Sequence, residues 1–336
     1  MTFIEEKIRI TLGKLNEFII WDSKTITGIK FAKCGYKTSN QPEEGLNWED
    51  YEAGSPVKFK QDEHAWIKFT VDVPEVSDDE CMILKATTGR EGQWDSLNPQ
   101  GMIFIGDSTT CAQALDTNHT EFLLTPGKKE IYIYFYAGMI GDPVLFLGFA
   151  LQKKNMKLNR LYYDMLVPYE AMKCLDKNSY EYYTIINHLD KACQLLDLRT
   201  LRSKDLCDSA DKAIEYLHEE FYGKVCGKEQ TRGEIALFGH THIDVAWRWT
   251  LAQTEEKAQR SFSTVIALME QYPDYIFMSS QPQLYAYVKK NDPELYEKIK
   301  ERIKEGRWET EGAMWLESDT NLVSGESLVR QIMYGK

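Results

Sequence analysis

The spacing of apolar residues changes twice along the chain, and these changes constrain the fold more than any other feature of the sequence. Before about residue 155, β-branched and aromatic residues form short runs that often alternate with polar residues, as in strands. From about 158 they recur three and four positions apart, as on one face of a helix. After about 235, short apolar runs alternate with helical patterns. We therefore predict a multidomain α and β protein with parts at 1–157, 158–228 and 229–336.

The first part is predicted to be an antiparallel β-sandwich or jelly-roll-like domain. Clusters of Asp, Asn, Gly and Pro separate its predicted strands, and such clusters are typical of turns. The predicted strands are IRITL (8–12), TITGIKFA (25–32), HAWIKFTVDV (64–73), CMILKATT (81–88), GMIFIG (101–106), EIYIYFYAG (130–138) and VLFLGFALQ (144–152).

The second part is predicted to be a helical connecting segment. Its helical pattern has few glycines and extends over 161–175, 180–198 and 207–221. Gly223, Gly227 and the polar run 227–234 are expected to link this segment to the third part.

The third part reads as an α/β domain. Residues 235–238 form a continuous apolar run that ends at Gly239, which is the pattern of a parallel strand buried on both faces. Further strands are expected at 275–278 and 307–316. The expected helix caps are Thr254, Asp292 followed by Pro293, and Ser324, with Gly306 ending the second helix. The order β, α, β, α, β, α predicts a parallel sheet or a barrel, but a (β/α) barrel typically needs about 250 residues and is therefore incomplete here.

Composition narrows the classes of partner and compartment. Forty Lys and Arg against 52 Asp and Glu give a net charge of −12, which repels phosphate backbones and anionic lipids, so we expect neither a nucleic-acid nor a membrane partner. The chain has no apolar stretch of about 18 residues and no signal-peptide pattern at its start, so the expected compartment is the cytoplasm. The seven Cys form no CxxC pair and are expected to be buried free thiols.

Two of the six His lie in GHTHIDVAWRW (239–249), directly after the predicted strand 235–238. In an extended segment, residues i, i+2 and i+4 share a face, so His240, His242 and Asp244 are expected to point together at the carboxyl end of that strand. Active sites of α/β barrels and open sheets lie at this end. Two imidazoles and a carboxylate suit Zn²⁺ or a similar divalent ion. A purely structural role at the strand end is the alternative for so short a pattern.

A second polar cluster, WETEGAMWLESDTN (308–321), lies at the end of the third predicted strand and just before the last predicted helix. It offers four carboxylates and two tryptophans. Paired carboxylates carry out glycoside hydrolysis, and aromatic rings stack on sugar faces. Alone, an acidic run is also typical of a solvated turn, but two such clusters at successive strand ends favour a site.

Together these motifs carry a resemblance. GHTHIDVAWRW, followed by EGAMWLESDTNLVSGESLVRQ (311–331), resembles glycoside hydrolase family 38, the zinc-dependent retaining α-mannosidases, in the subgroup of cytosolic α-mannosidases and their bacterial homologues. The resemblance covers about 235–336, and the stretches at 92–95 and 98–100 are more loosely similar to the leading domain of that subgroup. Arg248 and Ala313 depart from the residues usual in the family, which affects the shape of the pocket and leaves the reaction class unchanged.

The resemblance implies roles for particular residues. His242, Asp244 and Asp319 would be ligands of one zinc ion, and Asp319 would also be the catalytic nucleophile. Trp247 matches the aromatic residue beneath the sugar. The implied activity is hydrolysis of terminal α-mannosyl residues of oligosaccharides through a covalent glycosyl-enzyme on Asp319. The implied architecture of 229–336 is the first part of a (β/α)7-type barrel.

Other implied parts of the site play a supporting role or lie outside this sequence. His240 and Glu317 are expected to orient the ligands through hydrogen bonds. The family's fourth zinc ligand is a later His and its general acid/base a later Asp, and since no His follows His242, both are expected beyond Lys336. We therefore expect residues 1–336 to be an inactive N-terminal fragment that holds zinc weakly or not at all.

Two other functions stay open at this point. His240 and His242 also resemble the HxH metal pair of amidohydrolases, in which a metal-bound hydroxide attacks an amide or ester. That alternative leaves Asp319 and the tryptophan pair unexplained. The sandwich domain would also suit a non-catalytic carbohydrate-binding or assembly module. A homo-oligomer is compatible with the mannosidase prediction and with both alternatives.

Overall fold

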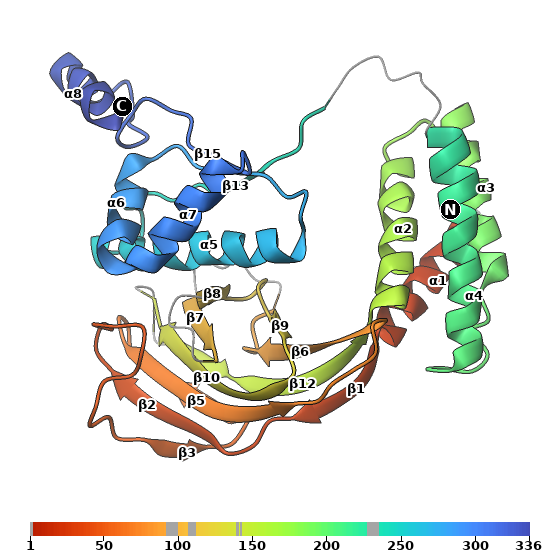
Figure 1. Cartoon of the computed structure of the whole chain (residues 1–336), viewed down its shortest axis with the longest axis horizontal. Helices are drawn as coiled ribbons and strands as arrows, with labels where there is room; N and C mark the ends of the chain where they lie inside the picture. The colour runs from red at the N-terminus through yellow and green to blue at the C-terminus, as the bar shows by residue number, and fades with distance from the viewer. Residues whose placement is uncertain (1–2, 92–99, 107–111, 139–140, 142, 227–234) are drawn as a thin grey trace.

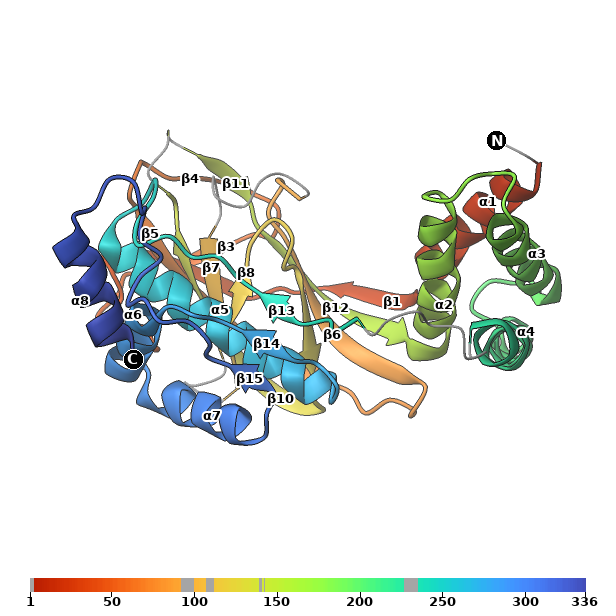
Figure 2. The same cartoon turned by 90° about the horizontal axis from the view of Figure 1, so that it is seen from above.

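The computed structural model describes residues 3–91, 100–106, 112–138, 141, 143–226 and 235–336, and it arranges them as a β-sandwich, a helical bundle and a small α/β unit (Figure 1). The bundle lies beside the sandwich in both views, while the α/β unit lies over one of its sheets (Figure 2). Among the described residues, no helix is long and apolar enough to cross a membrane.

The sandwich consists of two antiparallel sheets and a short extra strand pair. The six-stranded sheet has the order β3-β2-β5-β10-β7-β8, and the four-stranded sheet has the order β1-β12-β6-β9. Strands β4 and β11 form the pair. The bounds are β1 (Ile20–Thr25), β2 (Ile29–Cys34), β3 (Glu49–Tyr51), β4 (Pro56–Lys58), β5 (His64–Val73), β6 (Glu80–Thr87), β7 (Gln100–Ile105), β8 (Ala112–Leu115), β9 (Glu121–Leu124), β10 (Gly127–Tyr136), β11 (Val144–Phe146) and β12 (Gly148–Asn155).

Both faces of the six-stranded sheet are partly buried, and this positions the rest of the molecule. Strand β5 pairs with β10 along its whole length, with Trp66 opposite Tyr134 and Ile67 opposite Ile133. Because side chains alternate across a strand, Ile67 and Ile133 enter the core between the two sheets. Trp66 and Tyr134 point to the other face, where they form a second apolar cluster with Met102, Phe104 and Ala112.

The prediction of a strand at 8–12 was wrong, because this run lies inside helix α1 (Phe3–Phe18). Ile8, Leu12 and Leu15 are buried at helical spacing, and the alternation in IRITL is only a short part of that longer pattern. Each of the other predicted runs overlaps at least one strand. The predictions at 92–95 and 98–99 lie outside the described residues.

Helix α1 packs into the helical bundle and not into the sandwich. It contacts α2 (Met156–Met172) and α3 (Tyr180–Leu195), and α4 (Lys204–Tyr216) closes the bundle before a π-helical stretch at Leu217–Cys226. Asn155, Ser179 and Ser203 cap α2, α3 and α4 with their side chains. The six described cysteines are free, but of these only Cys193 is buried: Cys34, Cys81 and Cys207 are partly buried, and the expectation of burial was wrong for Cys174 and Cys226, which are exposed.

The α/β unit contains a parallel three-stranded sheet of order β13-β14-β15, with helices packed on it. Phe262, Phe277 and Trp308 form its aromatic core, with ring centroids 4.7 to 6.3 Å apart. The parallel order is as predicted, whereas the barrel stays a prediction. The bounds are β13 (Gly239–His240), α5 (Leu251–Gln271), β14 (Phe277–Met278), α6 (Pro282–Asn291), α7 (Pro293–Lys304), β15 (Trp308–Glu309) and α8 (Gly325–Gly335).

Details of this unit differ from the sequence predictions. Residues 235–238 are exposed and form no strand, because β13 is an edge strand and no described element covers the residues before it. The cap of α5 is Thr250 and not Thr254, which lies in the first turn. The third strand is limited to Trp308–Glu309. Asp292 and Ser324 cap α7 and α8 as predicted.

Candidate functional site

The first motif begins on β13 and continues as a loop to the start of α5. Backbone and side-chain contacts hold this loop against the α/β unit: Ile243 is buried in the core, and the side chain of Gln281 donates a 3.0 Å hydrogen bond to the Ile243 carbonyl. Thr254, in the first turn of α5, has its hydroxyl 3.4 Å from the Asp244 carbonyl. The loop is therefore tied to two helices.

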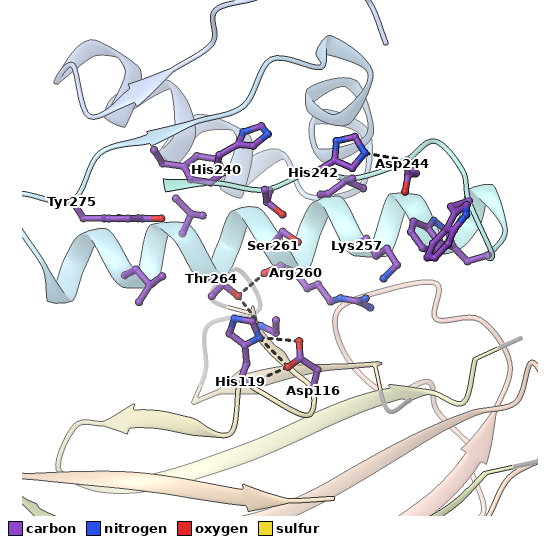
Figure 3. Close-up of a pocket in the computed structure, with 18 residues that line it drawn as sticks. Asp116, His119, His240, His242, Asp244, Lys257, Arg260, Ser261, Thr264 and Tyr275 are labelled. Carbon is purple, nitrogen blue, oxygen red and sulfur yellow. Dashed lines mark hydrogen bonds and ion pairs between the residues drawn. The ribbon is translucent and has the colours of Figure 1, made fainter. Parts of the chain in front are cut away.

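The side chain of His242 contacts carboxylates from both sequence motifs. Its Nε2 lies 3.1 Å from Oδ1 of Asp244, and its Nδ1 lies 2.9 Å from Oε2 of Glu317. Figure 3 shows the His242 ring and Asp244 side by side, above α5. The structure thus brings together His242, Asp244 and Glu317, which come from both sequence motifs.

His240 does not join that contact, although the alternation predicted a shared face for all three residues. Its Nδ1 lies 3.0 Å from the carbonyl oxygen of Met278 on the neighbouring strand β14. Since a carbonyl oxygen only accepts, Nδ1 is the donor in this contact. The His240 ring is therefore fixed by the sheet and not by its motif partners.

Asp319 lies in the same loop as Glu317, two residues further on. Its Oδ1 accepts hydrogen bonds from the backbone N–H groups of Asn321 (2.7 Å) and Leu322 (3.2 Å). The carboxylate thus closes a local turn, and the structure does not bring it to His242. Within the part of the chain that the structure describes, no group of three or more His, Cys, Asp or Glu side chains is arranged to hold a metal ion.

The donor chemistry nevertheless fits a divalent ion. Imidazole nitrogen and carboxylate oxygen are common Zn²⁺ ligands, and His242 with Asp244 supplies one of each at hydrogen-bond distance. Both His242 nitrogens face carboxylates, so one of them would have to exchange a carboxylate for the ion. His242 and Asp244 are thus the pair that could hold a metal, with Glu317 orienting the ring from its other nitrogen.

The tryptophans of the first motif stand at the exposed end of the loop. Trp247 is 46% exposed and makes an edge-to-face contact with Trp249 at 5.9 Å. The Arg248 guanidinium lies 4.8 Å from the centre of the Trp247 ring. The indole N–H of Trp249 donates to the Thr254 hydroxyl at 3.0 Å. An exposed ring beside a polar cluster is suited to stacking on a sugar.

A cavity of about 460 Å³ runs from this loop across α5 to the sandwich (Figure 3). Lys257 and Arg260 line it from α5, and Asp116 and His119 line it from the segment between β8 and β9. Burial alone would raise the pKa of Asp116, but the His119 ring and the backbone N–H groups of Asn118 and His119 lower it to about 2. The sequence carries no signal that links these four residues to the motifs, because only the packing of the sandwich on α5 brings them there.

Comparison with known proteins adds to this geometry. Residues 232–336 match the family described as glycosyl hydrolases family 38 N-terminal domain. The chain is 32% identical to alpha-mannosidase G of Dictyostelium discoideum over 287 residues, which are 81% of this chain and 25% of that protein. It is 39% identical to alpha-mannosidase 2C1 of Mus musculus over 136 residues, and 34% identical to alpha-mannosidase of Saccharomyces cerevisiae over 137 residues.

These matches cover unequal shares of the proteins. The mouse match includes 39% of this chain and the yeast match 38%, and each includes 13% of the relative. The chain therefore spans a quarter or less of the length of these relatives. A solved structure of TmCBM61 in complex with β-1,4-galactotriose covers 42% of this chain and 91% of its own at 11% identity, but its TM-score of 0.19 is too low to indicate a shared fold.

Proposed function

Residues 232–336 belong to glycoside hydrolase family 38, and from this membership we propose that the protein containing this chain is a zinc-dependent retaining α-mannosidase. The substrate class is an oligosaccharide with terminal α-mannosyl residues, as the names of its alpha-mannosidase relatives suggest. A cytoplasmic location is part of the same proposal.

The observation that carries the proposal is the contact between His242 and Glu317. It joins the loop after β13 to the loop after β15, so the two family motifs meet at the carboxyl ends of the parallel strands. Active sites of parallel sheets lie at these ends, which open to solvent. Asp319 follows Glu317 in the same loop, which supports its assignment to the same site.

In the proposed site, each residue has a defined task. His242, Asp244 and Asp319 would hold the zinc ion, which when bound supplies positive charge that engages vicinal sugar hydroxyls. For this, Asp319 would leave its turn at Asn321 and face His242. Trp247 would stack beneath the mannose ring, and Glu317 would keep the His242 ring in place.

The proposed reaction proceeds in two displacements at the anomeric carbon. First, an Asp319 carboxylate oxygen forms a bond to that carbon while the bond to the leaving-group oxygen breaks, and an acid outside the residues assigned here protonates the leaving group. Second, water replaces Asp319 and restores the original configuration. Asp319 is exposed, so its carboxylate is accessible to a substrate that enters this loop from solvent.

The test is nitrophenol release from an aryl α-mannoside by the full-length gene product, with and without chelator. We expect Asp319→Ala to lower kcat on the order of a thousandfold or more. Asp274→Ala, at an exposed position outside both motifs, is the matched control and should keep full activity. Activity that survives both Asp319→Ala and the chelator would rule out the proposed mechanism.

A further inference from the structure

The surface of α5 that faces the sandwich is polar, although it is buried. Gln253, Glu256, Gln259, Arg260 and Ser263 are all at most 8% exposed. The helix crosses the outer face of the six-stranded sheet, beside β7 and β8 (Figures 1 and 2). Buried polar groups destabilise a protein unless partners satisfy them, so this surface requires a precise counterpart on the sandwich.

On the sandwich, Gln100 of β7 accepts a hydrogen bond from Arg260 at 2.6 Å, and Lys37, which follows β2, faces Gln259 and Glu256. The Lys37 ammonium donates to the side-chain oxygens of Gln259 at 3.0 Å and Asn40 at 3.2 Å. The Gln259 amide in turn donates to Asp292 at 2.7 Å and to Asn40 at 3.0 Å. One chain of hydrogen bonds therefore runs from the sandwich through α5 to the cap of α7.

Lys37 also faces the only strongly buried carboxylate on this part of α5, that of Glu256. Burial lowers the pKa of Lys37 and raises the pKa of Glu256, and the attraction between the two opposes both shifts. Arg260, Gln253 and Tyr134 also stabilise the Glu256 carboxylate. Removal of Lys37 would leave Glu256 with less compensation in a buried environment, which destabilises the packing of α5 on the sandwich at this point.

The first turn of α5 is connected directly to the proposed active site. Thr254 accepts the indole N–H of Trp249 and lies 3.4 Å from the Asp244 carbonyl. The hydroxyl of Thr250, which caps α5, lies 3.2 Å from the hydroxyl of Tyr36. Tyr36 directly precedes Lys37, so two adjacent sandwich residues contact the cap and the third turn of the same helix.

We propose that Lys37 is a positioning residue for the proposed active site: through Gln259 and Glu256 it fixes α5, and through Thr254 this helix fixes the loop that carries Asp244 and Trp249. The proposal rests on the proposed function only for its kinetic readout. It makes the sandwich domain a working part of the site and not a separate binding module. A misplacement of about 1 Å can lower a rate about a hundredfold, so a small shift of α5 is sufficient to slow the reaction.

The experiment compares Lys37→Met with Lys24→Met, which removes an exposed lysine from strand β1 and leaves α5 untouched. Two readouts are used on the full-length gene product: kcat and KM for an aryl α-mannoside, and amide hydrogen exchange of residues 240–256. We expect Lys37→Met to lower kcat about tenfold with a KM change below about twofold, and to speed exchange in this segment about tenfold. Lys24→Met should match the wild type in both.

A second substitution distinguishes positioning from a general loss of stability. In Lys37→Met/Glu256→Gln an uncharged amide replaces the carboxylate that lost its partner. We therefore expect kcat and the exchange rate of residues 240–256 to return at least halfway to the wild-type values. If Lys37→Met does not fold, Lys37→Gln takes its place, because it removes the charge but keeps a side-chain amide that can still donate toward Gln259 and Asn40. Unchanged exchange in residues 240–256 for the folded variant would overturn the proposal. An inactive wild type would refute the proposed function alone, since exchange still reports the position of α5.

Discussion

Nδ1 of His242 lies 2.9 Å from a carboxylate oxygen of Glu317, although the strands that lead to these two residues are not neighbours in the sheet. Strand β14 lies between β13 and β15, and the loops that follow the two outer strands meet over its end. The contact thus spans the full width of the parallel sheet. This contact fixes the orientation of the His242 ring, which also contacts Asp244.

This arrangement predicts different metal affinities for two histidine variants. In the full-length gene product, His242→Ala should abolish measurable Zn²⁺ binding in equilibrium dialysis, because it removes a proposed ligand. His240→Ala should weaken binding far less, because the His240 ring is held by the Met278 carbonyl and lies outside the contact of His242 with Asp244 and Glu317. The reverse order would favour the amidohydrolase-type reading, in which His240 is itself a ligand.

The buried His64 predicts a loss of stability in mild acid. Burial lowers its pKa from about 6.5 to about 4, an effect that nearby Asp62 partly opposes. The folded state therefore favours neutral His64, whose contribution to stability is fully present above pH 6.5 and is lost as the pH falls toward 4. Relative to His64→Gln, the free energy of unfolding should drop by about 1.4 kcal/mol per pH unit in this window.

Urea unfolding of the wild type and His64→Gln at a series of pH values measures this difference. Parallel pH profiles of the two proteins would contradict the expectation. The Tyr134 hydroxyl lies 2.6 Å from His64 Nδ1, and the rings of Tyr36 and Tyr136 lie within 5.0 Å, so protonation would place a charge among aromatic side chains.

The aromatic core of the α/β unit predicts a large effect of Phe262→Ala. Phe262 is fully buried and contacts Phe277, Tyr285 and Trp308. Its truncation should lower the free energy of unfolding of this unit by about 3–5 kcal/mol. Leu251→Ala, on the same helix but 57% exposed, should change it by no more than about 0.5 kcal/mol. Urea unfolding followed by hydrogen exchange of α5 measures both, and similar losses in the two variants would show that Phe262 is not a core residue.

The helix caps Asp292 and Ser324 differ in burial, so we expect their removal to lower the free energy of unfolding by different amounts. Asp292 is 3% exposed, accepts the backbone N–H of Leu295 and also binds Gln259. Asp292→Ala should cost about 2–4 kcal/mol, since it removes a cap and leaves a buried amide with one partner fewer. Ser324→Ala removes an exposed cap and should cost about 1 kcal/mol. Equal midpoints in chemical denaturation would show that the Gln259 contact contributes nothing.

Local patterns were sufficient to predict most elements of this chain. The alternation in 64–73 and the helical spacing in 180–198 give strand β5 and helix α3, because burial of one face requires a fixed period. Asp292 and Ser324 were recognisable as caps because a cap acts on the backbone within three residues. The run 8–12 failed because five residues fit both periods, and only the packing of α1 against the bundle distinguishes them.

In the candidate site, too, local sequence and tertiary packing determine different features. The sequence by itself determined the residue types, their order and their place after parallel strands, since these are properties of short segments. Tertiary structure alone decided that Glu317 reaches His242, that His240 turns to Met278, and that Lys37 of the sandwich contacts α5. These contacts join residues far apart in sequence, and their formation depends on how whole elements pack, which no local spacing encodes.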